Sequence, residues 1–288
     1  MLLDIVQTAF DGLMVGGLYA SVALGITLVF GLMGILNFAH GQMVRLGAYI
    51  AFYAVASGLG FWVGTALAML AMGLFGALLE RAIFRRTLVD PMAGLTVSLG
   101  LIMIIENLAA AWFTPDPRFM DPPLSGDFRL GPLALSSQRL LVLLLAAAMI
   151  TAFYLFLKRT RLGKAIRAMA QSRQGASLVG VKVTRVSAAI FMIGSALAGA
   201  AGALYASLFA ISPFMGNTPL MKGFILAAFG GLGSVPGAIV AGALLGLAES
   251  FGSRYLSAAF RDGYGFILLI LTLLLMPNGL FGARKGRI

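Results

Sequence analysis

Few ionisable side chains interrupt the long apolar stretches of this sequence, so those few are the first candidates for chemistry. Glu106 lies beside Asn107 inside one apolar run, Lys222 opens another, and Glu249 ends it. If these runs cross a membrane, an ionisable side chain within them is costly and usually faces the protein interior. Glu106 and Glu249 could be proton or ion sites. For Glu106 we favour a structural role, paired with an arginine such as Arg45.

The single histidine, His40, is the second candidate. It lies in the polar sequence from Asn37 to Gln42, and together with Asn37 it could line a polar path or bind freed backbone groups. Because no carboxylate is close to it in sequence, a hydrogen-bonding role is favoured over proton relay or catalysis.

Several kinds of chemistry are excluded by what the sequence lacks. The chain has no cysteine, which rules out disulfides, thiolate metal sites and thiol catalysis. It also has one histidine and no G-x-x-x-x-G-K-[ST] phosphate loop. We therefore expect no metal site, no directly bound cofactor and no enzymatic activity, ATP hydrolysis included.

The most basic part of the chain, 158–185, contains no acidic residue and could be a docking surface. It holds eight of the 21 lysines and arginines. They are Lys158, Arg159, Arg161, Lys164, Arg167, Arg173, Lys182 and Arg185.

Within this segment, Thr160 could cap a helix that begins at Arg161. Leu162, Ile166 and Met169 would then form one apolar stripe, with basic residues beside it. Such a helix could lie across the membrane surface and insert into a partner. The alternative is a cytoplasmic loop that touches only lipid headgroups.

The composition is that of a membrane protein. Of the 288 residues, 60% are hydrophobic and 11% are charged, and the mean hydropathy is +0.98. Soluble proteins have about 25% charged residues. The net charge of +11 is better explained by cytoplasmic loops rich in Lys and Arg than by nucleic-acid binding, which we do not expect.

The apolar runs predict one all-α, polytopic membrane domain over 1–288. The loop after Glu80 contains three arginines and should be cytoplasmic, whereas the acidic loop 114–139 should be extracytoplasmic. The basic segment 158–185 is then cytoplasmic, the N-terminus is outside, and Arg284, Lys285 and Arg287 put the C-terminus inside. Spans are predicted at 5–31, 41–58, 61–80, 92–113, 140–157, 186–209 and 263–282.

The apolar stretch 219–252 is predicted to be a broken pair of short segments. As one helix, at ~1.5 Å per residue, it would be too long for ~30 Å of hydrocarbon. Gly230, Gly231, Gly233 and Ser234, followed by Pro236, signal a break. Two segments also restore the cytoplasmic C-terminus, which makes about eight or nine membrane segments. Interrupted segments of this kind point to a transport pathway.

Five short motifs in this order resemble the permeases of bacterial high-affinity branched-chain amino acid ABC importers (LivH type). Asn37 to Gly41 reads NFAHG, and Thr160 to Ala165 reads TRLGKA. The others read GVKV, GGLGSVPGA and MPNG, and begin at Gly180, Gly230 and Met276. The motif TRLG is also similar to the corresponding motif of ribose-type sugar permeases, whereas NFAHG favours the amino acid permeases.

The resemblance implies a type II-like ABC permease fold and a coupling helix in 158–185. Residues 161–179 would fit a cleft of a cytoplasmic ATPase, with Arg161, Leu162, Gly163, Lys164, Ile166, Arg167 and Met169 as coupling residues. The partners would be a second, homologous permease, two ABC ATPases that use ATP and Mg, and an extracytoplasmic solute-binding protein, with lipids around them in the inner membrane. The binding protein would dock on 114–139 and 211–221.

Two alternatives stay open from the sequence. An ion- or proton-coupled secondary carrier would use Glu106 or Glu249 instead of ATP. A member of the same ABC family could import urea or short amides instead of branched-chain amino acids. The residues assigned to the pathway are Asn37, His40, Glu106, Gly230, Gly231, Gly233 and Ser234.

Overall fold

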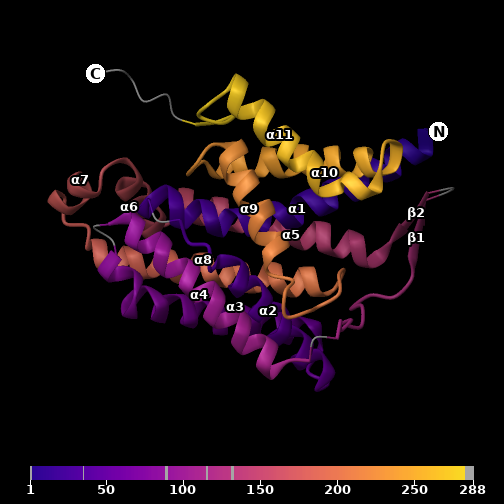
Figure 1. Ribbon diagram of the computed structural model, residues 1–288, viewed down its shortest axis with the longest axis horizontal. Helices are drawn as coiled ribbons and strands as arrows, with labels where there is room; N and C mark the ends of the chain where they lie inside the picture. Colours follow the sequence, from indigo (N-terminus) through magenta and orange to yellow (C-terminus); the bar gives the residue numbers. More distant parts are fainter. Residues whose placement is uncertain (1, 35, 88–89, 115, 131–132, 283–288) are drawn as a thin grey trace.

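The computed structural model describes residues 2–34, 36–87, 90–114, 116–130 and 133–282, and most of them are helical. The long helices run roughly along the longest axis of the molecule (Figure 1). The first half contains α1 (Leu2–Met33), α2 (His40–Ala56), α3 (Gly60–Ala82), η1 (Phe84–Thr87), α4 (Pro91–Trp112), β1 (Asp127–Leu130) and β2 (Leu133–Ser136). The second half contains α5 (Ser137–Arg159), α6 (Arg161–Gln171), α7 (Arg173–Leu178), α8 (Val183–Ala206), α9 (Asn217–Gly230), α10 (Val235–Tyr255), η2 (Ala258–Phe260) and α11 (Arg261–Leu275).

Seven helices of the described residues are long and apolar enough to cross a membrane, judged by length and composition. They are α1, α3, α4, α5, α8, α10 and the segment that contains α11. With 17 and 14 residues, α2 and α9 are shorter. Every predicted span overlaps one helix, and the broken pair appears as α9 and α10. The basic residues Arg284, Lys285 and Arg287, used to orient the C-terminus, lie outside the described residues.

A β-hairpin corrects the all-α prediction. Strands β1 and β2 pair antiparallel, with Asp127 opposite Ser136 and Phe128 opposite Leu135. The hairpin lies at the same end of the molecule as the N-terminus and directly precedes α5 (Figure 1). It falls inside the loop 114–139, where prolines and acidic residues hid the short strand pattern.

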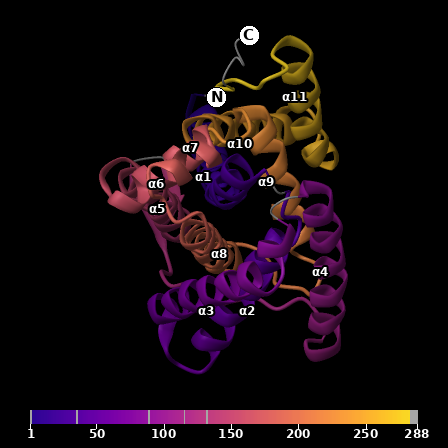
Figure 2. The ribbon, with the colours of Figure 1, turned by 90° about the vertical axis from the view of Figure 1, so that its left-hand side faces the viewer.

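Helices α1 and α8 form the centre of the bundle. In an apolar 18-residue window of α1 83% of the residues are buried, and in that of α8 72% are, against 22% in α4 and 11% in the segment that contains α11. Figure 2, seen along the helices, accordingly shows α1 and α8 inside a ring that includes α3, α4 and α11. The outer helices expose large apolar side chains, as lipid-facing or subunit-facing helices do.

Small residues bring α1 and α10 into backbone contact. A Cβ placed on Gly246 would meet the backbone of Gly12 and Gly16, and one on Gly242 would meet Gly16 O at 2.7 Å. The four-residue glycine spacing therefore serves close helix packing. These contacts fix the antiparallel register of α1 and α10.

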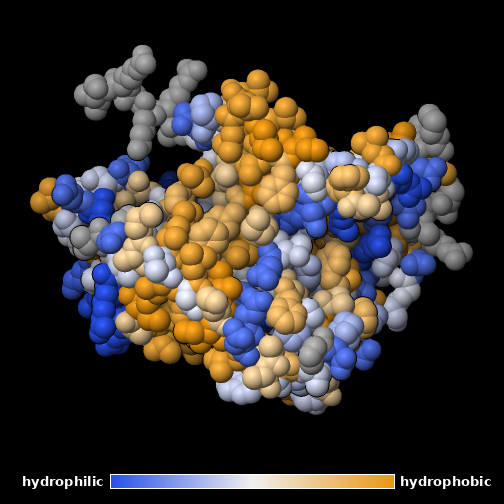
Figure 3. Space-filling model, in the orientation of Figure 1, coloured by the Kyte–Doolittle hydropathy of each residue, from blue (hydrophilic) through white to orange (hydrophobic). Residues whose placement is uncertain are grey.

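The molecular surface divides into an apolar middle and polar ends. On the face in Figure 3, hydrophobic residues gather in the middle, and hydrophilic residues are concentrated at the left and right ends. Helices α6 and α7 lie at the left end and the hairpin at the right end (Figure 1). The molecule thus presents the two polar ends that a membrane-embedded bundle requires.

Candidate functional site

Helix α6 begins where the sequence predicts it. Thr160 Oγ1 accepts a hydrogen bond from Gly163 N at 2.9 Å and so caps the helix. A Cβ on Gly163 would lie 2.5 Å from the carbonyl oxygens of both Phe156 and Leu157. Gly163 therefore allows α6 to fold back tightly against the end of α5, and its first role is structural.

The two faces of α6 differ sharply in exposure. Ile166 and Met169 are 1% and 2% exposed and belong to the apolar core of the bundle, and Leu162 is half-buried against it. This burial corrects the interpretation that the apolar stripe grips a partner, because these side chains contact their own chain. The face left free is basic, and it consists of Arg161, Lys164 and Arg167.

Helix α7 continues this surface and ties it to α1. Ser172 caps α7 by accepting from Gly175 N at 3.0 Å. Arg173 donates to Met33 O, at the C-terminus of α1, at 3.3 Å, where a cation is favoured by the helix dipole. The side chains of Leu178 and Val179 are 88% and 78% exposed. Sequence reasoning missed this apolar pair, which ends the short polar helix.

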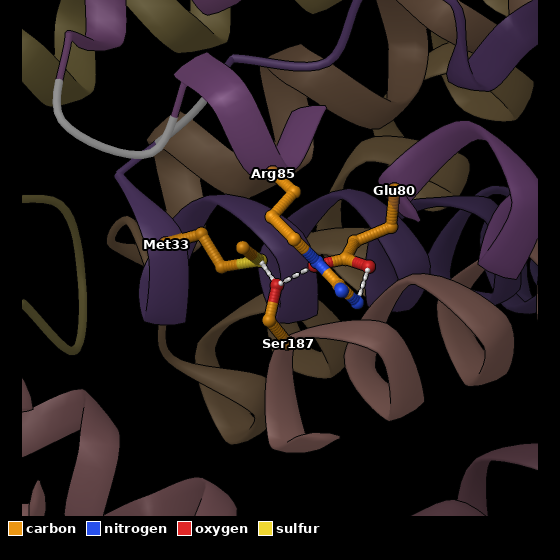
Figure 4. Close-up of polar contacts among 4 residues, drawn as sticks. All are labelled: Met33, Glu80, Arg85 and Ser187. Carbon is orange, nitrogen blue, oxygen red and sulfur yellow. Dashed lines mark hydrogen bonds and ion pairs between the residues drawn. The ribbon is translucent and has the colours of Figure 1, made fainter. Parts of the chain in front are cut away.

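A buried carboxylate connects the ends of α3 and α8 on the same side of the molecule. Glu80 is 0% exposed and accepts from Arg85 Nη2 at 2.8 Å and from Ser187 Oγ at 2.7 Å. Ser187 Oγ also lies 3.6 Å from Met33 Sδ (Figure 4). The hydrogen bond to Glu80, and then its charge, raise the pKa of Arg85. The cluster thus joins three helices next to α7.

This cluster could not be predicted from the sequence, because its members are distant along the chain. Its one local signal was an acidic residue at the end of a predicted span, five residues before an arginine.

Asn37 and His40 lie inside the bundle. Asn37 Oδ1 accepts from Ala39 N at 3.1 Å, and the His40 ring sits against Gly25 of α1. Both are nearly fully buried. Both His40 ring nitrogens and Asn37 Nδ2 have no hydrogen-bond partner among the described atoms, so the hydrogen-bonding role favoured for His40 stays a prediction.

The next turns of α2 carry further buried polar side chains that the sequence analysis did not assign to the pathway. Gln42, Arg45 and Tyr49 are at most 2% exposed and lie on one face of the helix. Arg45 Nη1 donates to the carbonyl of Pro213. Its Nε and Nη2, the Gln42 amide and the Tyr49 hydroxyl have no hydrogen-bond partner among the described atoms. Buried polar groups normally have hydrogen-bond partners. This face of α2 is therefore an unusual row of buried polar side chains within the apolar bundle.

Glu106 is half-buried on α4. Among the described residues no lysine or arginine nitrogen lies within 4.0 Å of its carboxylate. The expected ion pair with Arg45 is therefore not formed.

Glu249 is held in an ion cluster between α9, α10 and α11. Lys222 Nζ lies 2.5 Å from Glu249 and 2.9 Å from Asp262, and Arg261 Nε lies 3.6 Å from Glu249. Lys222 and Glu249 are both buried. The two cationic partners of Glu249 offset the cost of burying this carboxylate, and its use as an ion-coupling site stays a prediction.

The glycine break makes a tight backbone contact with α1. Gly231 and Gly233 adopt φ of +98° and +88°, which favours glycine. A Cβ on Gly233 would lie 2.9 Å from Gly31 Cα, and one on Gly230 would meet Gly237. Ser234 caps α10 by accepting from Gly237 N at 3.1 Å. Of these, Gly233 and Ser234 line a cavity beside α6.

At the opposite end, two loops predicted to meet a binding protein are joined to each other. Arg118 and Ile211 exchange backbone hydrogen bonds of 2.9 and 2.8 Å. The Arg118 guanidinium lies over the rings of Phe52 and Tyr53, 5.7 and 5.6 Å from their centroids. The outer loops and α2 therefore form one connected surface.

A multi-helix apolar bundle with a broken helix pair and an amphipathic helix across one end has the architecture expected of a membrane permease. The sequence model described as "Branched-chain amino acid transport system / permease component" matches residues 8–276, and the chain belongs to this family. The resemblance to LivH-type permeases is thereby confirmed.

Named relatives agree with this membership. The chain is 32% identical to the LivH permease protein of Salmonella typhimurium and to the BraD permease protein of Pseudomonas aeruginosa. Each comparison covers 96% of this chain and 95% of the relative. The chain is also 29% identical to the LivM permease protein of Salmonella typhimurium, over 91% of this chain and 67% of LivM. No solved structure matches the chain.

Proposed function

We propose that this chain is a transmembrane permease subunit of an ATP-driven ABC importer for branched-chain or related amino acids. The proposal depends mainly on the difference between the two sides of α6. Its apolar side is buried in the bundle, while its basic side is exposed. Relatives named as high-affinity branched-chain amino acid transport permeases supply the substrate class. ATP hydrolysis belongs to partner subunits.

The proposed topology has nine membrane segments, with the N-terminus outside and the C-terminus in the cytoplasm. We count the short helices α2 and α9, of 17 and 14 residues, as segments of their own. Gly31, near the end of α1, contacts the break at Gly233, which supports placing both on the cytoplasmic side with α6. Loop 114–139 is then extracytoplasmic and 158–185 is the coupling loop of a single permease domain.

The coupling residues divide into two roles. Arg161, Lys164 and Arg167 contact the ATPase, together with the exposed pair Leu178 and Val179 of α7. Leu162, Ile166 and Met169 transmit the movement, because they are packed against the membrane helices. Gly163 sets the turn between α5 and α6.

The assembly contains a second permease, two cytoplasmic ATPases and an external binding protein. Similarity to a LivM permease supports a heterodimer of related permeases in the inner membrane. The binding protein docks on the surface joined through Arg118 and Ile211. The pathway runs along the buried polar face of α2, where Asn37 and His40 form part of the wall, and past the break at Gly230, Gly231, Gly233 and Ser234, with Glu106 at its edge.

Uptake of labelled leucine tests this proposal. Cells that contain the chain and its partners should lose uptake when the partner ATPase genes are deleted, because the chain has no phosphate loop. Uptake that persists without any partner ATPase, and that collapses with the proton or sodium gradient, would instead establish a secondary carrier. Competition by urea or short amides would identify the related substrate class.

A further inference from the structure

A cavity of about 290 Å³ lies between α6 and the glycine break. Its walls come from α1, α5, α6 and the residues 233–236. Ligand pockets for small molecules usually have roughly 300–1,000 Å³. The cavity is therefore at the lower end of this range, and part of one flexible chain could fill it.

The inner wall of the cavity is apolar. Leu28, Leu157 and Ile166 are 2%, 7% and 1% exposed, and Val235 and Pro236 complete this side. A hydrocarbon chain could enter here without burying any polar group of its own.

The rim of the cavity is basic. Lys158 and Arg167 are both exposed and both line the cavity. Arg167 Nη2 lies 3.5 Å from the backbone carbonyl oxygen of Lys158, which holds the Arg167 side chain at this rim. Lys158 Nζ also lies 4.7 Å from the centroid of the Tyr154 ring. Two adjacent cations and an aromatic ring at the end of a membrane helix form a typical headgroup environment.

One buried polar atom of the cavity lining has no hydrogen-bond partner within the described part of the chain. Thr27, on α1, is 1% exposed, and its hydroxyl has no hydrogen-bond partner among the described atoms. Because Thr27 lines the cavity, a ligand oxygen there could accept a hydrogen bond from its hydroxyl group. The cavity thus combines cations, one hydroxyl donor and an apolar wall.

We propose that this cavity binds an anionic phospholipid of the cytoplasmic leaflet. The phosphate lies between Lys158 and Arg167, an ester oxygen meets Thr27, and part of one acyl chain fills the apolar wall. The inference rests on the proposed topology, which puts α6 at the cytoplasmic surface. The bound lipid links the coupling helix to the glycine break, so it stabilises the arrangement through which α6 acts on α9 and α10.

A fluorescence measurement on the full chain tests the site directly. The reporter is Tyr154→Trp in a chain that carries Trp62→Phe and Trp112→Phe, reconstituted into phosphatidylcholine vesicles. Phosphatidylglycerol with a brominated acyl chain should quench the reporter more effectively than brominated phosphatidylcholine. Two basic residues should favour the anionic lipid by roughly tenfold or more in apparent affinity.

Matched substitutions separate a site from general attraction. Lys158→Gln with Arg167→Gln should abolish the preference, and Thr27→Val should weaken quenching by both lipids. Arg81→Gln with Arg86→Gln removes two exposed basic residues that do not line the cavity, and it should leave the preference unchanged.

Three results would overturn the proposal. Equal quenching by both brominated lipids would mean ordinary annular contact. Equal loss in both double substitutions would mean a general effect of positive charge. Displacement of the anionic lipid by inorganic phosphate alone would mean a free-anion site. Since the assay reads lipid binding and not uptake, any of them leaves the proposed transport function to stand or fall by the leucine experiment.

Discussion

The substitution Glu80→Gln tests whether the buried cluster of α3, η1 and α8 holds the coupling end of the bundle together. The change keeps the shape of the side chain and removes its charge. A glutamine oxygen in the place of Oε1 can still accept from Ser187 Oγ and from Arg85 Nε at 3.4 Å. Its NH₂ group, in the place of Oε2, must then face the donor Arg85 Nη2, which now lies 2.8 Å from that oxygen.

The expected loss of stability follows from these contacts. Hydrogen bonds to a charged group contribute ~1.5–3 kcal/mol each. The Arg85 side chain is 37% exposed, so water replaces a large part of its bond, and the remaining cost is about 1–2 kcal/mol. The apparent melting temperature should fall by roughly 2–8 °C. Ser187→Ala should cost about 1 kcal/mol, and less when Glu80 is already replaced, because the two residues share one bond.

The assay is thermal unfolding of the purified chain in detergent, with Glu106→Gln as the matched control. Glu106 is half-buried and makes no ion pair within the described part of the chain, so its substitution should shift the melting temperature little. Equal melting temperatures for both variants and the parent would refute the assigned role of Glu80.

Two further predictions concern glycines that the structure puts at backbone contacts. Gly246→Ala should destabilise the chain by about 1–3 kcal/mol through overpacking, measured by the same unfolding assay. The control Gly100→Ala, whose new Cβ meets nothing within 4 Å, should be neutral or slightly stabilising. Similar losses of stability in both variants would contradict close packing of α1 and α10. Gly163→Ala should displace α6 from α5 and abolish stimulation of the partner ATPase by the loaded binding protein. The control Gly175→Ala, whose Cβ would approach only the Ser172 side chain at 3.3 Å, should retain this stimulation. Unchanged stimulation in the Gly163→Ala variant would show that the tight turn is dispensable.

The helices of the bundle were largely predictable because each apolar run is a local property of the chain. The cap at Thr160, the start of α6 at Arg161 and the break at 231–234 follow from side chains within a few residues of each feature. The predicted spans differ from the helices mainly at their ends, where turns and caps decide the boundary.

Contacts between distant segments were not predictable in the same way. The sequence shows that Ile166 and Met169 form a stripe, but not whether the stripe faces a partner or its own bundle. The bond between Ser187 and Glu80 spans 107 residues, and Lys222 meets Glu249 only because α9 and α10 fold back on each other. Such pairs depend on helix packing, which periodicity in one segment does not encode.

The most direct test of the central claim is site-specific crosslinking from α6 in the assembled transporter. A photoreactive side chain at Lys164, on the exposed face, should crosslink to the ATPase subunit. The same group at Ile166, on the buried face, should crosslink only within this chain, because that side chain is 1% exposed. Crosslinking to the ATPase from Ile166 as strongly as from Lys164, or from neither position, would contradict the proposal that the basic face of α6 receives the work of ATP hydrolysis.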